Sequence, residues 1–192
     1  MGLTRLETDE LWISKPALDN RAKETLAYLQ TQNLKGKRLA DCGEYNPMAR
    51  RIENLLDREI ETLDWDFDRN FGTQYGKYDV IFCFEVLEHL FNPLFFLQVL
   101  KYHLESGGII YLSTPRQWPQ CIKAIHHYHE IPTDRLMWLF DAAGLQVEEM
   151  VKITIAGNWY NHLYGIRPIL RYFQKTRLYK LRVLEEETIS VG

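Results

Sequence analysis

The sequence predicts an α/β fold in three layers, with a mostly parallel sheet between helices on both of its faces. Two observations lead to this prediction. Short apolar segments of strand length alternate along the chain with longer segments in which apolar residues recur at helical spacing. In addition, residues 77–115 read as a complete strand, helix and second strand. A unit of this kind places its two strands parallel in one sheet.

The elements before this unit follow from the same signals. Residues 17–32 form an amphipathic pattern and should be a helix that covers an edge of the sheet. Residues 38–43 are a short apolar run that ends in a glycine turn, which predicts the first strand. Asn46 and Pro47 then begin a second helix. Residues 59–68 alternate between apolar and polar side chains and predict the next strand.

The central unit has the clearest boundaries. Residues 80–84 are continuously apolar, which is typical of a strand buried on both faces. Asn92 and Pro93 mark the start of the following helix, as a cap residue and a proline at the first helical position. Gly107 and Gly108 should end that helix. The next strand, residues 109–112, should end by Pro115, because proline cannot continue an interior ladder.

The last elements should complete the sheet. A helix is expected to begin at residues 132–134 and to end at Gly144. Residues 145–155 should form a strand, and residues 179–187 its antiparallel hairpin partner. We expect one domain over residues 1–192, with a helical cover at 1–34, the core at 36–150, and C-terminal strands with a basic aromatic insertion at 151–192.

Composition excludes several classes of function. The 192-residue chain is 46% hydrophobic and has a net charge of -3, so a general nucleic-acid-binding role is not expected. No apolar run approaches the roughly 18 residues of a membrane span, and the first residues lack the apolar core of a secretory signal, so a cytoplasmic location is expected. The three cysteines, Cys42, Cys83 and Cys121, have no CxxC spacing. Cys42 and Cys83 should be small buried residues.

Polar side chains gather where three of the expected strands end. In an open parallel sheet, ligands bind at this carboxyl edge. An acidic residue at the end of the second strand can accept both hydroxyls of a ribose, and Asp64 lies 23 positions after Asp41, close to the spacing of about 20 in nucleotide-binding units. Asp64 is therefore the predicted ribose ligand, with Asp66 as the alternative. The competing interpretation is a solvated acidic loop.

The segment from Glu85 to Leu90, EVLEHL, resembles the central signature of class I S-adenosylmethionine-dependent methyltransferases. YDVI at 78–81 before it and LESGG at 104–108 after it strengthen the likeness, which is closest to the type 11 group with its ubiquinone-biosynthesis-like enzymes. The resemblance covers about residues 36–150. It implies a Rossmann-like sheet, S-adenosylmethionine as the cofactor, and methyl transfer as the activity.

The resemblance also assigns roles to residues, with two departures from the family pattern. Asp41 and Gly43 match the Asp-x-Gly-x-Gly-x-Gly loop, and Asp41 would hold the cofactor's amino group. Tyr45 and Pro47 replace the other two glycines, so either the loop takes another path or the methionine end of the pocket is partly filled. The predicted cofactor contacts are Asp41, Cys42, Gly43, Tyr45, Asp64, Trp65, Phe84 and Glu85.

The second departure is a missing element. The family usually has a helix and a third strand after the predicted ribose ligand, but only 15 positions separate Asp64 from Asp79. One strand should therefore be lost or shortened between residues 65 and 77. Trp65, Phe67 or Phe71 could then cover the face of the adenine.

Two clusters in the sequence contain possible metal ligands. Glu85, Glu88 and His89 could bind a metal, line the cofactor pocket, or bond to backbone at a helix start. His127 and His129 could bind zinc. Because neither cluster has a matching second set, no metal site is predicted. By resemblance, the loop with these histidines faces the reaction cleft, and His129 is the predicted catalytic base.

The expected function is S-adenosylmethionine-dependent methyl transfer to a small molecule or to a glycan or lipid-type metabolite. The alternative is a methyltransferase fold that has lost turnover and acts as a binding or scaffolding protein. Residues 157–182 interleave basic and aromatic side chains, which could bind a phosphate-bearing or glycan substrate, or a membrane surface weakly. The competing interpretation is a cover helix with basic residues facing water.

Overall fold

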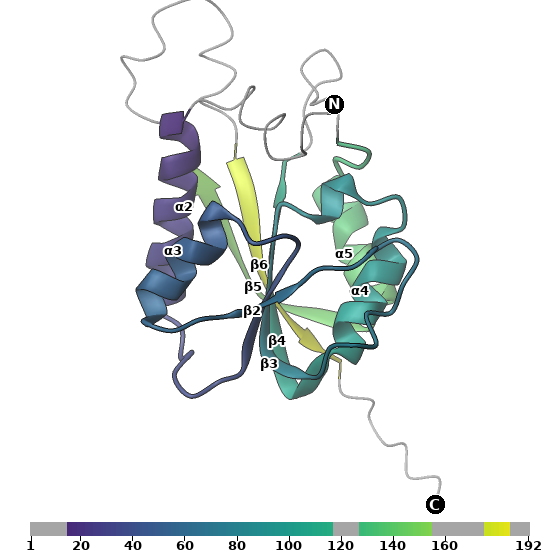
Figure 1. The fold of residues 1–192 in the computed structure, drawn as a ribbon. Helices are drawn as coiled ribbons and strands as arrows, with labels where there is room; N and C mark the ends of the chain where they lie inside the picture. Colours follow the sequence, from purple (N-terminus) through teal and green to yellow (C-terminus); the bar gives the residue numbers. More distant parts are fainter. Residues whose placement is uncertain (1–14, 117–126, 155–174, 185–192) are drawn as a thin grey trace, which may run out of the picture.

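A computed structural model describes residues 15–116, 127–154 and 175–184 (Figure 1). One six-stranded sheet has the order β2-β1-β3-β4-β6-β5. The first four of these strands are parallel, and β6 is antiparallel to both of its neighbours. The elements in chain order are α2 (Lys15–Gln30), β1 (Leu39–Cys42), α3 (Pro47–Leu56), β2 (Glu61–Leu63), β3 (Tyr78–Phe84), the 3₁₀ helix η1 (Leu87–His89), α4 (Pro93–Tyr102), β4 (Leu104–Pro115), α5 (Thr133–Ala142), β5 (Leu145–Thr154) and β6 (Lys175–Val183).

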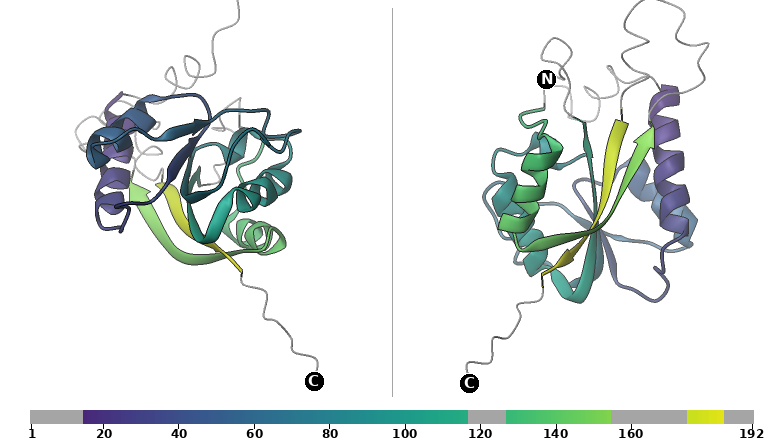
Figure 2. Two further views of the ribbon diagram at one scale, coloured as in Figure 1. Left: turned by 60° about the horizontal axis from the view of Figure 1, so that its bottom comes forward. Right: turned by 180° about the vertical axis from the view of Figure 1, so that it is seen from behind.

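The helices form the two outer layers of the fold. Figure 2 shows α2 and α3 on one face of the sheet and α4 and α5 on the other. The predicted three-layer α/β architecture and the parallel unit of β3, α4 and β4 are confirmed. Asn92 caps α4 as expected, because its side chain accepts a hydrogen bond from the Phe95 amide at 3.2 Å.

The expected loss of a strand is also confirmed. Residues 64–77, all of them described, contain no helix and no strand, so the sheet stops at β2. The prediction of a strand over 59–68 was wrong in extent, since β2 has only three residues. The Tyr75 hydroxyl accepts a hydrogen bond from the Asp64 amide at 3.1 Å and donates to the Asp64 carbonyl at 2.9 Å. These bonds turn the backbone out of the sheet directly after Leu63.

The side chain of His103 also holds the connection of residues 64–77 in place. The two ring nitrogens of His103 lie 2.9 Å from the Gly76 carbonyl oxygen and 2.7 Å from that of Phe71. His103 is fully buried at the C-terminal cap of α4, and β4 begins directly after it. The helix therefore ends before the expected glycine stop at Gly107.

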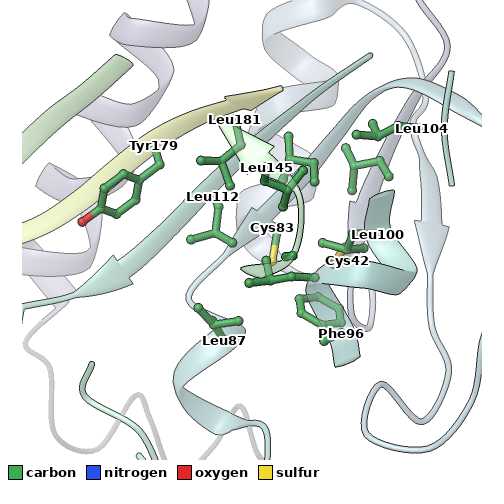
Figure 3. Packing of buried hydrophobic residues seen from close by; sticks show 14 of the residues in the cluster. Cys42, Cys83, Leu87, Phe96, Leu100, Leu104, Leu112, Leu145, Tyr179 and Leu181 are labelled. Atoms are coloured by element: carbon green, nitrogen blue, oxygen red, sulfur yellow. The ribbon is translucent and has the colours of Figure 1, made fainter. Parts of the chain in front are cut away.

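The core lies on both faces of the sheet. Along β3, Ile81 and Cys83 pack on the side of α4 and α5, while Val80 and Phe82 pack on the side of α2 and α3. All four are fully buried, as expected for a central strand. Figure 3 shows the first of these clusters, which includes the free thiols of Cys42 and Cys83. Burial raises the pKa of the Cys42 thiol. The prediction that these two cysteines are buried is confirmed.

The last two strands, β5 and β6, pair antiparallel as expected. β6 spans Lys175–Val183, earlier than the predicted 179–187, and lies between β4 and β5. The pairing of β5 with β6 has a register shift between Val147 and Glu149. Most of the basic aromatic segment 157–182, and Cys121, fall outside the described residues. Within the described ranges, no helix combines the length and apolar character needed to cross a membrane.

Candidate functional site

The loop after β1 leaves open space at the carboxyl edge of the sheet. Gly43 has a φ of +102°, a conformation that favours glycine, and its amide donates a 2.8 Å hydrogen bond to the Leu63 carbonyl at the end of β2. A Cβ added at Gly43 would meet no atom within 4 Å. A ligand could therefore approach the backbone closely at this point.

Asp41 lies two residues before Gly43, near the end of β1, and its carboxyl group is buried. It is 2% exposed and accepts a 3.1 Å hydrogen bond from the side-chain amide of Asn46. Asn46 also caps α3, because its carbonyl oxygen accepts from the amides of Met48 and Ala49. Burial raises the pKa of Asp41 to about 7, and the hydrogen bond from Asn46 offsets part of this effect.

Tyr45 does not fill the space above Gly43. Its hydroxyl donates a 2.6 Å hydrogen bond to Glu53 on α3, and its side chain is largely exposed. The other carboxylate oxygen of Glu53 accepts from the amide of Ile60, just before β2. The Tyr45 side chain thus extends along α3 toward the amino end of β2. The Tyr45 side chain is therefore directed toward Glu53, and the cofactor role of Tyr45 stays a prediction.

The side chains of Asp64 and Trp65, which follow β2, lie in different surroundings. Asp64 is exposed and directly follows Leu63, the last residue of β2, which pairs with Cys42 at the end of β1. Its carboxylate is therefore at the same edge as Asp41 and Gly43. The Trp65 ring instead packs 5.4 Å from the ring of His103, which precedes β4, so it lies away from the carboxyl edge.

Two further predicted cofactor contacts, Cys42 and Phe84, differ in how much of their side chains is accessible to a ligand. The Cys42 side chain belongs to the core, so only its backbone is available to a ligand. Phe84 is half-buried, with its ring stacked on Phe82 at a centroid distance of 5.8 Å. Phe84 therefore lines the end of β3 on the face of α2 and α3. The cofactor roles of these residues stay predictions.

Glu85 occupies a strained position at the end of β3. It has a φ of +55°, which is uncommon for a residue other than glycine and is frequent at functional sites. Its carboxylate accepts a 2.7 Å hydrogen bond from the Arg21 guanidinium and a 2.8 Å bond from the Ser113 hydroxyl. Arg21 comes from α2, and nothing in the sequence indicated that these two residues would meet. Glu85 is thus held between a helix and the neighbouring strand β4.

The loop before α5 is attached to η1. The amides of Tyr128 and His129 both donate to the Glu88 carbonyl oxygen, at 2.9 and 3.1 Å. His129, the predicted base, is half-buried in this loop, and its catalytic role stays a prediction. His127 lies beside it, with Nδ1 3.2 Å from a carboxylate oxygen of Glu130.

Comparison with known proteins agrees with this geometry. The family model for a methyltransferase domain matches residues 21–150, most of the described chain. A curated relative, the ubiquinone biosynthesis O-methyltransferase of Xanthomonas axonopodis pv. citri (strain 306), is 30% identical over 40% of this chain and 39% of its own length. The chain thus spans about two fifths of the length of the curated relatives it matches.

Solved structures share the fold at low sequence identity. The methyltransferase in complex with the Trm112 activator of Haloferax volcanii has a TM-score of 0.65 and is 17% identical, over 88% of this chain and 92% of that one. An O-methyltransferase of Brevibacillus brevis, in complex with S-adenosyl-L-homocysteine, has a TM-score of 0.54 and is 15% identical, over 84% and 71% of the two chains. The chain belongs to the methyltransferase domain family and has the fold of class I S-adenosylmethionine-dependent methyltransferases.

Proposed function

We propose that the protein transfers the methyl group of S-adenosylmethionine to a hydroxyl oxygen of a small-molecule acceptor. The observation that carries the proposal is the alignment of Asp41, Gly43 and Asp64 along the carboxyl ends of β1 and β2, in a chain of the methyltransferase family. The choice of oxygen rests on the curated relatives, which are O-methyltransferases.

The described residues fit this cofactor. The open space over Gly43 admits a ligand close to the backbone, and the buried Asp41 carboxyl can accept hydrogen bonds from an amino group. The exposed Asp64 carboxylate can accept both hydroxyls of a ribose. The cofactor supplies a methyl group that its sulfonium already makes electrophilic. The protein's part is to align the acceptor with that group and to exclude water.

A histidine near the same edge completes the proposed chemistry. His129 lies next to η1, because its amide donates a hydrogen bond to the Glu88 carbonyl oxygen. An imidazole there can act as a general base and take the proton from an acceptor hydroxyl. No covalent intermediate with the protein is needed.

Calorimetric titration tests the cofactor site directly. The wild-type protein should bind S-adenosylmethionine and S-adenosylhomocysteine with a micromolar dissociation constant. Asp64→Asn should weaken binding about 10- to 100-fold, because hydrogen bonds to a charged group contribute about 1.5–3 kcal/mol. Glu59→Gln is the matched control, since it removes an exposed carboxylate just before β2, at the opposite edge.

Two results would contradict the proposal. One is a folded wild-type protein, shown by circular dichroism, that binds neither ligand. The other is equal loss of affinity in the Asp64→Asn and Glu59→Gln variants, which would indicate a general charge effect. The scaffolding alternative is not favoured, because the family match extends through the site and the Tyr45 side chain lies along α3.

A further inference from the structure

The structure brings together two groups of residues that looked unrelated in the sequence. Glu88 and His89 lie in η1, directly after β3, and His127 lies in the loop before α5. Each of the three side chains offers one ligand atom, and these atoms all lie within 4.8 Å of one another. We propose that Glu88, His89 and His127 bind a divalent first-row transition metal.

The spacing of the three side chains is close to that of a metal site. With metal–ligand distances of about 2.0–2.2 Å, ligand atoms around one ion are roughly 3–3.5 Å apart. Small changes of side-chain torsion can bring the three ligand atoms to this separation, because hydrogen bonds already hold the two backbone segments together. The amides of Tyr128 and His129 hold the loop of His127 against the carbonyl of Glu88. The rings of His89 and His127 are 5.0 Å apart, edge to face.

A second carboxylate supports one of the imidazoles. The contact of His127 Nδ1 with Glu130 at 3.2 Å leaves Nε2 as the atom available to a cation. Metal-binding histidines usually have such a carboxylate or carbonyl on the other ring nitrogen, which fixes the tautomer and the ring orientation. The Glu130 side chain is 2% exposed, so this support comes from the interior of the protein.

The cluster lies in the interior of the protein. Glu88 and Glu130 are 1% and 7% exposed, and His89 is 8% exposed. Carboxylate oxygen and imidazole nitrogen are both ligands that first-row transition metals bind in proteins.

The kind of ligand indicates the kind of metal. Imidazole nitrogen suits zinc, iron and related first-row ions, whereas Mg²⁺ and Ca²⁺ prefer sites made of oxygen. A site with two nitrogens and one carboxylate should therefore prefer Zn²⁺ over Mn²⁺ and Mg²⁺. Three protein ligands leave at least one coordination position for an exogenous ligand.

The position of the site suggests its use, and this step rests on the proposed function. Glu88 lies in the turn that follows Glu85 at the carboxyl end of β3, where the acceptor would meet the cofactor. A bound cation would lower the pKa of a coordinated hydroxyl, whose proton would pass to solvent. The acceptor's oxygen then forms the bond to the methyl carbon as the carbon–sulfur bond breaks, and that electron pair stays on sulfur.

Calorimetry on tag-free, chelator-treated protein with ZnCl₂, MnCl₂ and MgCl₂ tests the site without cofactor or acceptor. We expect one Zn²⁺ per chain with a micromolar or tighter dissociation constant, and at least about 10-fold weaker binding of Mg²⁺. Glu88→Gln and His127→Gln should each weaken Zn²⁺ binding by at least about 30-fold. His129→Gln, in the same loop but outside the cluster, should change it by less than about threefold.

Several outcomes would overturn the proposal. They are a folded wild-type protein without stoichiometric Zn²⁺ binding, equal effects of the three variants, or Mg²⁺ binding as tightly as Zn²⁺. The wild-type melting temperature should also rise with Zn²⁺, and that of His127→Gln should not. Metal binding and cofactor binding are measured separately, so either proposal can fail without the other. Zn²⁺ binding without cofactor binding would leave the metal site standing and remove the methyltransferase function.

Discussion

Replacing Asp41 with asparagine should change how the stability of the protein depends on pH. Burial raises the pKa of Asp41 from its ordinary value of 3.8 to about 7. Between these two values, the folded chain keeps a proton that the unfolded chain has released. The free energy of unfolding of the wild type therefore falls as pH rises through this window.

The size of the effect follows from the pKa difference. The full difference corresponds to about 4 kcal/mol, of which about 2–3 kcal/mol falls between pH 5 and pH 8. Asparagine has nearly the same shape and can still accept the hydrogen bond from Asn46, but it does not titrate. The wild type should thus lose about 2–3 kcal/mol of stability relative to Asp41→Asn over this range.

Urea unfolding at intervals from pH 5 to pH 8 measures the difference between the two proteins. Other titrating groups contribute equally to both curves and cancel. Asp64→Asn controls for the loss of one negative charge at the same edge and should follow the wild type. Wild-type and Asp41→Asn curves that stay parallel over the whole range would refute the reasoning.

The same group should couple proton release to cofactor binding. A cofactor ammonium group favours the ionised form of Asp41, so affinity for S-adenosylmethionine should rise by up to about tenfold per pH unit below pH 7. Asp41→Asn should bind more weakly and should lose most of this pH dependence. An unchanged dependence in the variant would place the titrating group elsewhere.

Two further substitutions test how the edge of the sheet is built. Asn46→Ala should lower the free energy of unfolding by about 1–2 kcal/mol, because it removes the cap of α3, while Asn54→Ala on the exposed side of the same helix should cost less than about 0.5 kcal/mol. Gly72→Ala should cost about 2–4 kcal/mol, since Gly72 has a φ of +59° and its Cβ would lie 2.8 Å from the Trp65 ring. Gly36→Ala, with a φ of +73° but no atom within 4 Å of the added Cβ, should cost about 1 kcal/mol. Chemical denaturation checks all four, and equal losses within either pair would contradict the explanation.

The sequence predicted those parts of the fold that depend on local signals. The apolar run at 80–84 and the cap formed by Asn92 and Pro93 defined β3 and the start of α4, and both are where they were expected. The end of α4 was not predicted, because it depends on the tertiary contacts of His103 with two carbonyl groups. The three-residue length of β2 likewise depends on the Tyr75 hydroxyl, 11 positions away.

The candidate site was predictable only in outline. Asp41, Gly43 and Asp64 could be placed from strand ends and spacing, since the carboxyl ends of parallel strands meet at one edge. The direction of Tyr45 could not be predicted, because it is set by Glu53. The meeting of His127 with Glu88 depends on how the loop before α5 folds back on η1, for which the sequence has no local signal.

The early end of the sheet has a consequence for how molecules of this protein meet one another. A sheet edge exposes unpaired backbone groups on which a second chain can add a strand, and long flat edges promote aggregation. The edge at β2 has only three residues, so it offers few such groups. The other edge, β5, is longer, but its pairing with β6 has a register shift between Val147 and Glu149. The short edge at β2 and the irregularity in β5 therefore both disfavour strand addition by a second chain.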